Sequence, residues 1–233
     1  MIRIPRFLPL WMAACGCTLA ASGQTGFPFQ DETLHYSVNW PSGLSMGDAN
    51  LTAHRSGKGW DFDMTLDAGI PGYRVTDHFR SSVNLDLCAL EFDRDTRHGT
   101  RKAADKSTFD YDTGMVHRAP ESGVPTDLPI ASHCVYDALG FVYAVRRELG
   151  QGRVMPSTQV FYGSPYSIRL EYAGAQSVKW NEKPETADRV VVHLKGTGSE
   201  TKFEILYRRD PARTPLLVKI PFSVGTLTME LVP

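Results

Sequence analysis

The sequence has no surplus of positive charge and no hydrophobic run long enough to cross a membrane as a helix. Its 233 residues include 25 lysines and arginines against 26 aspartates and glutamates, which gives a formal net charge of -1. Proteins that bind nucleic acids normally carry a clear basic excess, so the composition argues against that function. A membrane-spanning helix needs roughly 18 consecutive apolar residues, and the chain contains no such segment.

The spacings that are typical of metal sites are also missing. The seven histidines are scattered, and no two of them stand at a ligand spacing on one predicted element. The four cysteines form no CxxC pattern. The chain shows neither an internal repeat of fixed period nor a low-complexity tract. We therefore expect no metal and no cofactor.

The first 23 residues have the order of a secretory signal peptide. A basic start with two arginines is followed by an apolar stretch over residues 7–14 and by small residues at 20–23. We expect residues 1–23 to be removed by cleavage before Gln24. We then expect the protein to be exported.

The cysteines fall into two pairs. Cys15 and Cys17 lie within the predicted signal peptide, where a bacterial lipoprotein carries its lipid, so an anchored form is an alternative. Cys88 and Cys134 remain after cleavage, and such a pair usually forms a disulfide in an oxidising compartment. Closing a loop of this length stabilises a fold by about 4 kcal/mol on the chain-entropy model. The alternative is two buried free thiols.

From Thr33 onward the hydrophobic pattern has a period of two, which predicts strands with one face in a core. Turns containing Gly, Pro or Asp separate these strands, and their spacing favours antiparallel meanders over βαβ units. We predict a single β-rich domain over residues 24–233, with about ten to twelve strands. The alternating segments cover residues 33–40, 60–67, 166–172, 190–194, 203–207, 216–222 and 227–231.

One segment instead has the period of a helix. Apolar residues recur at helical spacing from Val135 to Leu149, with Ser132 as a suitable N-cap and Gly150 as a suitable C-cap. Aromatic side chains widen its apolar surface beyond one stripe, so we expect a sheet to surround it. The predicted fold class is mainly β: a large curved antiparallel sheet or half-barrel, like that of lipoprotein carriers, packed around one central α-helix. The residues expected to line a ligand cavity are Tyr136, Leu139, Phe141, Tyr143, Trp60 and Phe62.

Two patterns are compatible with hydrolytic chemistry. Residues 43–47 read Gly-Leu-Ser-Met-Gly, the G-x-S-x-G pattern of a nucleophile elbow, but the residues that follow alternate like a strand. We therefore interpret Ser45 as part of a glycine-rich strand connection. Asp61 and Asp63 share one face of a predicted strand. They are compatible with a hydrolytic carboxylate pair, and also with the solvent-exposed face of an ordinary strand.

A cluster of basic residues lies beside three aspartates, Asp93, Asp95 and Asp105. A hairpin that binds phosphate or lipid head groups has this composition, and so has a solvated hairpin whose charges neutralise one another. We favour the solvated hairpin. The basic residues are Arg94, Arg97, Arg101, Lys102 and Lys106.

Three segments together resemble a known family. The opening 32–40 (ETLHYSVNW) followed by Gly47, the aspartate-led helix 137–146 (DALGFVYAVR), and the tail from Phe203 through Pro215 to Gly225 and Leu231 are similar to the bacterial secreted proteins of domain of unknown function 3108. Gly140 and the step at Ala144-Val145 depart from that pattern. The resemblance implies a location in the bacterial envelope, in the periplasm or at the outer surface, and a mainly antiparallel β-architecture. It brings no activity and no catalytic residues.

The leading hypothesis for function is a non-enzymatic envelope protein that binds or carries an apolar or amphiphilic component, such as a lipid or an envelope polymer. A curved sheet with an apolar helix at its centre forms a natural ligand cavity. One alternative is an envelope hydrolase that acts on a glycan or ester through Ser45, Asp61 or Asp63. The other is a structural or assembly factor of the envelope.

Overall fold

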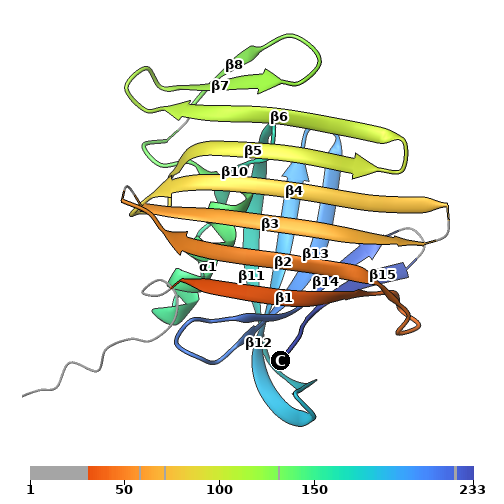
Figure 1. Cartoon of the computed structure of the whole chain (residues 1–233). Coiled ribbons are helices and arrows are strands. Elements are labelled where there is room, and N and C mark those ends of the chain that lie inside the picture. Colours follow the sequence, from red (N-terminus) through yellow and green to blue (C-terminus); the bar gives the residue numbers. More distant parts are fainter. Residues whose placement is uncertain (1–30, 58, 71, 131, 223–224) are drawn as a thin grey trace, which may run out of the picture.

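The computed structural model describes residues 31–57, 59–70, 72–130, 132–222 and 225–233, and these residues form fifteen strands and one helix (Figure 1). The predicted signal peptide, with Cys15 and Cys17, lies outside them. The elements are β1 (Glu32–Asn39), β2 (Ser45–Arg55), β3 (Gly59–Ile70), β4 (Tyr73–Asn84), β5 (Ala89–His98), β6 (Arg101–Asp110), β7 (Met115–Pro120), β8 (Thr126–Pro129), β9 (Tyr136–Asp137), α1 (Ala138–Gly150), β10 (Thr158–Phe161), β11 (Pro165–Trp180), β12 (Lys183–Gly196), β13 (Ser199–Arg208), β14 (Pro215–Phe222) and β15 (Gly225–Leu231).

All the strands belong to one sheet, in the order β8-β7-β6-β5-β4-β3-β2-β1-β15-β14-β13-β12-β11-β10-β9. Two antiparallel meanders, β1–β8 and β10–β15, are joined where β1 pairs with β15. The short β9 pairs in parallel with β10. The predicted mainly β fold with a large curved sheet and one helix is confirmed. The described strands exceed the ten to twelve expected, because β8, β9 and β10 have only four, two and four residues and are too short to show a period of two.

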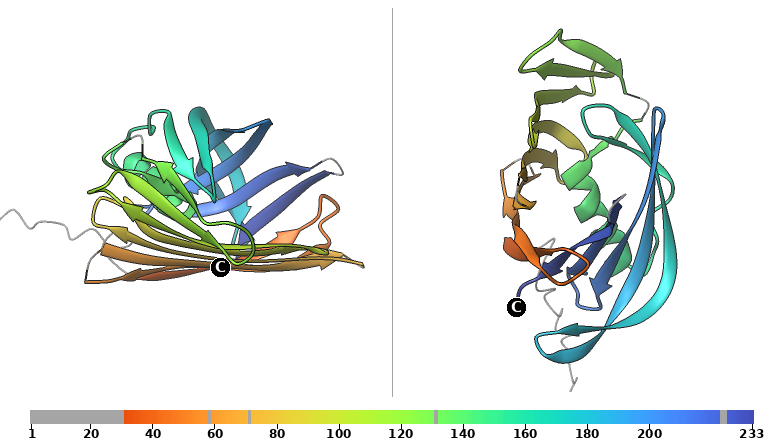
Figure 2. Two further views of the ribbon diagram at one scale, coloured as in Figure 1. Left: turned by 90° about the horizontal axis from the view of Figure 1, so that it is seen from above. Right: turned by 90° about the vertical axis from the view of Figure 1, so that its right-hand side faces the viewer.

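The sheet curves so that its two halves face each other as layers, with α1 between them (Figure 2). Alternate residues of each half point into the space between the layers and are buried there. The N-terminal half contributes Tyr36, Phe62 and Phe92, and the C-terminal half contributes Ile168, Val190 and Ile205. One core therefore fills the space between the layers.

Helix α1 begins and ends a few residues from the predicted positions. Its N-cap is Asp137, whose carboxylate accepts hydrogen bonds from the backbone N–H groups of Leu139 and Gly140. Ser132 is not the cap, because its hydroxyl bonds within the preceding turn to the backbone of Cys134. Val135 is also outside the helix, since its carbonyl accepts from Ala89 of β5 in a strand-like contact.

At its other end α1 finishes in a Schellman motif. Arg153 N–H donates to the Glu148 carbonyl and Gly152 N–H donates to the Leu149 carbonyl. Gly152 has a φ of +73°, so it supplies the left-handed residue of the motif. Gly150 is the last helical residue and not the cap, which is Gln151.

Two linkages fix α1 between the layers. The predicted disulfide is present: Cys88 and Cys134 are bonded, which ties the start of β5 to the segment before the helix. Near the other end of α1 the buried guanidinium of Arg146 pairs with Glu32 of β1 and donates to the Ala212 carbonyl. The helix is thus held to both halves of the sheet.

Candidate functional site: an apolar cavity

A cavity of about 530 Å³ lies between α1 and the C-terminal half of the sheet. Ligand pockets in proteins span roughly 300 to 1,000 Å³, so the volume is sufficient for a small ligand. Phe141, Val142 and Val145 of α1 form one wall. From the N-terminal half of the sheet, Phe79 on β4 reaches the cavity.

The opposite wall follows from the alternation of three neighbouring strands. Ile168 and Leu170 of β11, Val192 of β12, and Phe203 and Ile205 of β13 line the cavity. The registers Leu170↔Val192 and Val192↔Phe203 place these side chains side by side on the inner face. The period of two in the sequence therefore creates a continuous apolar surface across the three strands.

Polar groups occur at the cavity beside the turns that close β10–β11 and β12–β13. Tyr162 and Tyr166 line it near the first turn, and Ser199 and Thr201, both exposed, line it near the second. Burial raises the pKa of Tyr162 to about 12, so its hydroxyl stays protonated at neutral pH. The cavity is thus apolar along α1 and polar towards these turns.

The six predicted cavity residues do not all reach this space. Phe141 lines it. Trp60, Phe62, Leu139 and Tyr143 instead pack in the main core, and the rings of Phe62 and Tyr143 stack with centroids 3.9 Å apart. Tyr136 is partly buried on β9. Helical periodicity identifies a buried helix, but it does not distinguish the helical face that meets the N-terminal half from the face that meets the cavity.

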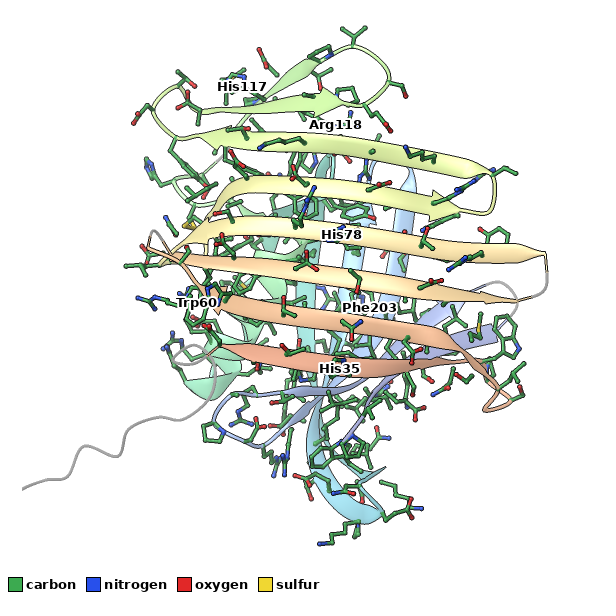
Figure 3. All side chains as sticks on the ribbon, viewed as in Figure 1. His35, Trp60, His78, His117, Arg118 and Phe203 are labelled. Carbon is green, nitrogen blue, oxygen red and sulfur yellow. A yellow bond between two sulfur atoms is a disulfide. The ribbon has the colours of Figure 1, made fainter. Side chains whose placement is uncertain are left out.

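Of the residues proposed for hydrolysis, Ser45 is far from the two aspartates, Asp61 and Asp63. Asp61 and Asp63 lie on the outer face of β3, opposite to the buried Trp60 and Phe62, beside a shallow surface hollow. Asp63 accepts a 2.6 Å hydrogen bond from His78, which is labelled in Figure 3. Asp61 pairs across the strands with His54, which lies at one end of β2, and Ser45 lies at the other end. At about 3.3 Å per residue, Ser45 and His54 are roughly 30 Å apart along the strand.

Most of the histidines pair with carboxylates, whereas His35 is bonded to the side-chain amide of Asn50. His78, His98 and His117 contact Asp63, Asp77 and Asp127 respectively, at 2.6 to 2.8 Å. Within the described ranges no group of three or more His, Cys, Asp or Glu side chains is arranged to hold a metal ion. Across the same residues, no helix has the length and apolar character needed to span a membrane.

The fold and the cavity define a class of proteins in which one sheet curves around a single helix, with an apolar cavity between the sheet and the helix. Within this class the chain belongs to the family of proteins of unknown function DUF3108, whose model matches residues 34–232. The family resemblance predicted from the three segments is therefore confirmed.

Among solved structures, the chain is similar to the crystal structure of a beta-barrel-like protein of domain of unknown function DUF1849 from Brucella abortus. The TM-score is 0.63 and the sequence identity is 8%, with 86% of this chain and 94% of that chain covered. At this identity the likeness concerns the fold. No curated protein matches the chain.

The sequence predicts the strands that line the cavity, but it does not identify several of their residues as cavity residues. Ile168, Leu170 and Val192 stand in segments that were predicted from alternation. The missing information was which strand faces the helix, and this depends on the β1–β15 pairing and the curvature of the whole sheet. Tyr162 stands in a turn, for which a period of two gives no signal.

Proposed function

We propose that the protein is an exported, non-enzymatic envelope protein that binds or carries an amphiphile, with the apolar part of the ligand in the cavity beside α1. The observation that carries this proposal is the cavity of about 530 Å³, whose walls along α1 are formed by aliphatic and aromatic side chains. Burying an alkyl chain there gains about 0.8 kcal/mol per CH₂ group. The polar residues towards the two turns support an amphiphilic ligand over a purely apolar one.

Binding is tested with an uncharged probe, so that the result depends on the cavity alone. The fluorescence of N-phenyl-1-naphthylamine is followed on addition of the purified protein, and hexadecanol is then added as a competitor. We expect the probe to bind and hexadecanol to displace it. Extraction of the protein purified from its cellular compartment, followed by mass spectrometry, should show a co-purified lipid.

A cavity-filling variant makes the test specific. Val142→Trp places an indole in the cavity from the partly buried face of α1. We expect the affinity for hexadecanol to fall by at least about tenfold. The matched control is Val124→Trp, because Val124 is 80% exposed in the turn between β7 and β8. The proposal is wrong if the wild-type protein binds neither compound, or if the two tryptophan variants bind hexadecanol equally while both are folded.

A further inference from the structure

A charged group lies against the wall of the cavity, on the inner face of the N-terminal half. Arg94 of β5 pairs directly across the strands with Phe79, which lines the cavity. Its guanidinium also packs over the ring of Tyr162, a second cavity residue, with Cζ 4.9 Å from the ring centroid. Arg94 does not itself line the cavity, but it contacts the cavity residue Tyr162 and is the cross-strand neighbour of a second one, Phe79.

The structure separates Arg94 from the basic cluster with which it is grouped in the sequence. Lys102 and Lys106 point outwards and pair with Glu121 and Glu91 at the surface. Arg94 points inwards, and its side chain is only 15% exposed. The expectation of a solvated hairpin thus holds for these lysines and is wrong for Arg94, because alternation along β5 turns it to the opposite face.

The charges around Arg94 do not balance within its hydrogen-bonded group. Arg94 and Arg118 both donate to one oxygen of Asp105, so two guanidinium cations share one carboxylate. Asp77 is on the same face of the sheet, but its carboxylate is bonded to His98 at 2.8 Å. The hydrogen-bonded group of Arg94, Arg118 and Asp105 therefore has a net charge of +1, while the carboxylate of Asp77, which also attracts Arg94, lies outside this group.

The same group contains polar atoms that are buried without partners. Among the described residues of this group, Nε of Arg94, Nε of Arg118, Oγ of Ser107 and one carboxylate oxygen of Asp105, Oδ1, have no hydrogen-bond partner. Ser107 is fully buried. A desolvated guanidinium whose donors are incompletely used interacts strongly with an acceptor that reaches its open edge, because the local dielectric is low.

A glycine leaves the space that this arrangement needs. Gly163 follows Tyr162 in the β10–β11 turn with a φ of +67°, and a Cβ there would lie 2.7 Å from Nη2 of Arg94. The turn closes through a hydrogen bond from Tyr162 N–H to the Ser164 carbonyl. Glycine adopts this backbone conformation without strain, and a side chain here would require the guanidinium to move.

We propose that the ligand is an anionic amphiphile, with its carboxylate or phosphate group held by Arg94 while its apolar chain fills the cavity. The inference rests on the proposed function and adds the charge of the ligand to it. Carboxylate and phosphate groups share the planar or branched oxygen pattern to which a guanidinium donates. Arg118 keeps Asp105 paired when Arg94 turns to the ligand.

The test compares ligands with one alkyl chain and different head groups. Hexadecanoate, hexadecyl phosphate and hexadecanol are titrated against the N-phenyl-1-naphthylamine complex of the wild-type protein, at a pH where the first two are charged. We expect both anions to bind at least about tenfold more tightly than hexadecanol. One charge-assisted hydrogen bond contributes about 1.5 kcal/mol, which corresponds to this ratio of affinities. Inorganic phosphate and acetate, which lack the chain, should not displace the probe or shift the thermal midpoint.

Variants then assign the preference to Arg94. Arg94→Gln should reduce the preference for the anions to less than about threefold and leave the affinity for hexadecanol unchanged. The matched control is Arg80→Gln, since Arg80 is on the neighbouring strand but on the outer face and is 63% exposed. Gly163→Ala is a second variant, because the added methyl group displaces the guanidinium without removing its charge.

The outcomes separate the two proposals. If the wild-type protein binds neither the probe nor any of the three ligands with an alkyl chain, the proposed function fails. If it binds hexadecanol and both anions equally, or if Arg94→Gln keeps the full preference, the proposed function stands and the inference about the head group is wrong. Binding of inorganic phosphate as tight as that of hexadecyl phosphate would also overturn it, since the site would then serve a free anion.

Discussion

The buried carboxylate of Asp137 makes the stability of this protein depend on pH. Asp137 is 0% exposed, caps α1 through Leu139 and Gly140, and accepts a 2.6 Å hydrogen bond from Ser81 of β4. Burial raises its pKa to about 6, against the opposing effect of these three hydrogen bonds. The folded protein therefore binds the Asp137 proton more tightly than the unfolded chain does.

The size of the effect follows from the pKa. A rise from 3.8 to about 6 corresponds to about 3 kcal/mol, at about 1.4 kcal/mol for each pH unit. Because the pKa is higher in the folded state, this stabilisation is fully present below about pH 4 and is lost as the pH rises through 6. Asp137→Asn retains an oxygen that can cap the helix but cannot ionise. Relative to this variant, the wild-type protein should lose about 3 kcal/mol of unfolding free energy between pH 4 and pH 7.

The assay is urea unfolding of both proteins at intervals from pH 4 to pH 8, followed by circular dichroism. Other titrating groups affect both proteins alike, so the difference between the two curves isolates Asp137. Ser81→Ala should move the fall to higher pH, because it removes a donor that favours the carboxylate. A difference that stays constant with pH would show that hydrogen bonding balances burial at this site, and a gain of stability by the wild-type protein as the pH rises would show that hydrogen bonding outweighs burial.

Two further predictions concern the linkages that hold α1. Replacing Cys88 and Cys134 together by serine should lower the unfolding free energy by about 4 kcal/mol, because a constraint across a sequence separation of 46 is removed from the unfolded chain; an unchanged urea midpoint would contradict this. Glu32→Gln should cost about 3 to 5 kcal/mol, since it removes the charge that compensates the buried Arg146. Thermal unfolding measures this loss, and Glu121→Gln, at a surface ion pair, should change the midpoint little.

The sequence predicts the elements of this fold better than their arrangement. Period-two alternation identifies strands such as β3 and β13, because each has one face in the core. The boundaries of α1 were less accurate because Val135 and Tyr136 are apolar at helical spacing and yet are held in strand contacts with β5 and β10. Tertiary pairing decides between the two conformations there, and a local pattern contains no information about it.

The site is predicted less well, for a related reason. Phe141 was expected at the cavity and lines it, whereas Trp60 and Phe62 lie in the core on the other side of α1. The sequence predicts Arg94 to be one of several solvated charges, although its position on β5 places it on the same face as the buried Phe92. Which face of a strand meets a cavity depends on the curvature of the sheet, and this is set by contacts between residues far apart in the chain.

The pairing of β1 with β15 has a consequence for the order in which the molecule folds. Each meander is built from neighbouring hairpins, whose contacts close short loops, but the seam joins Tyr36 to Leu231 across nearly the whole chain. Contacts of such long range are slow to form, because the entropy of a large loop must be lost first. The two meanders can therefore collapse early, each with an unpaired edge, and the seam closes last. Until the seam has formed, β1 and β15 present free backbone groups, and such unpaired edges favour edge-to-edge aggregation.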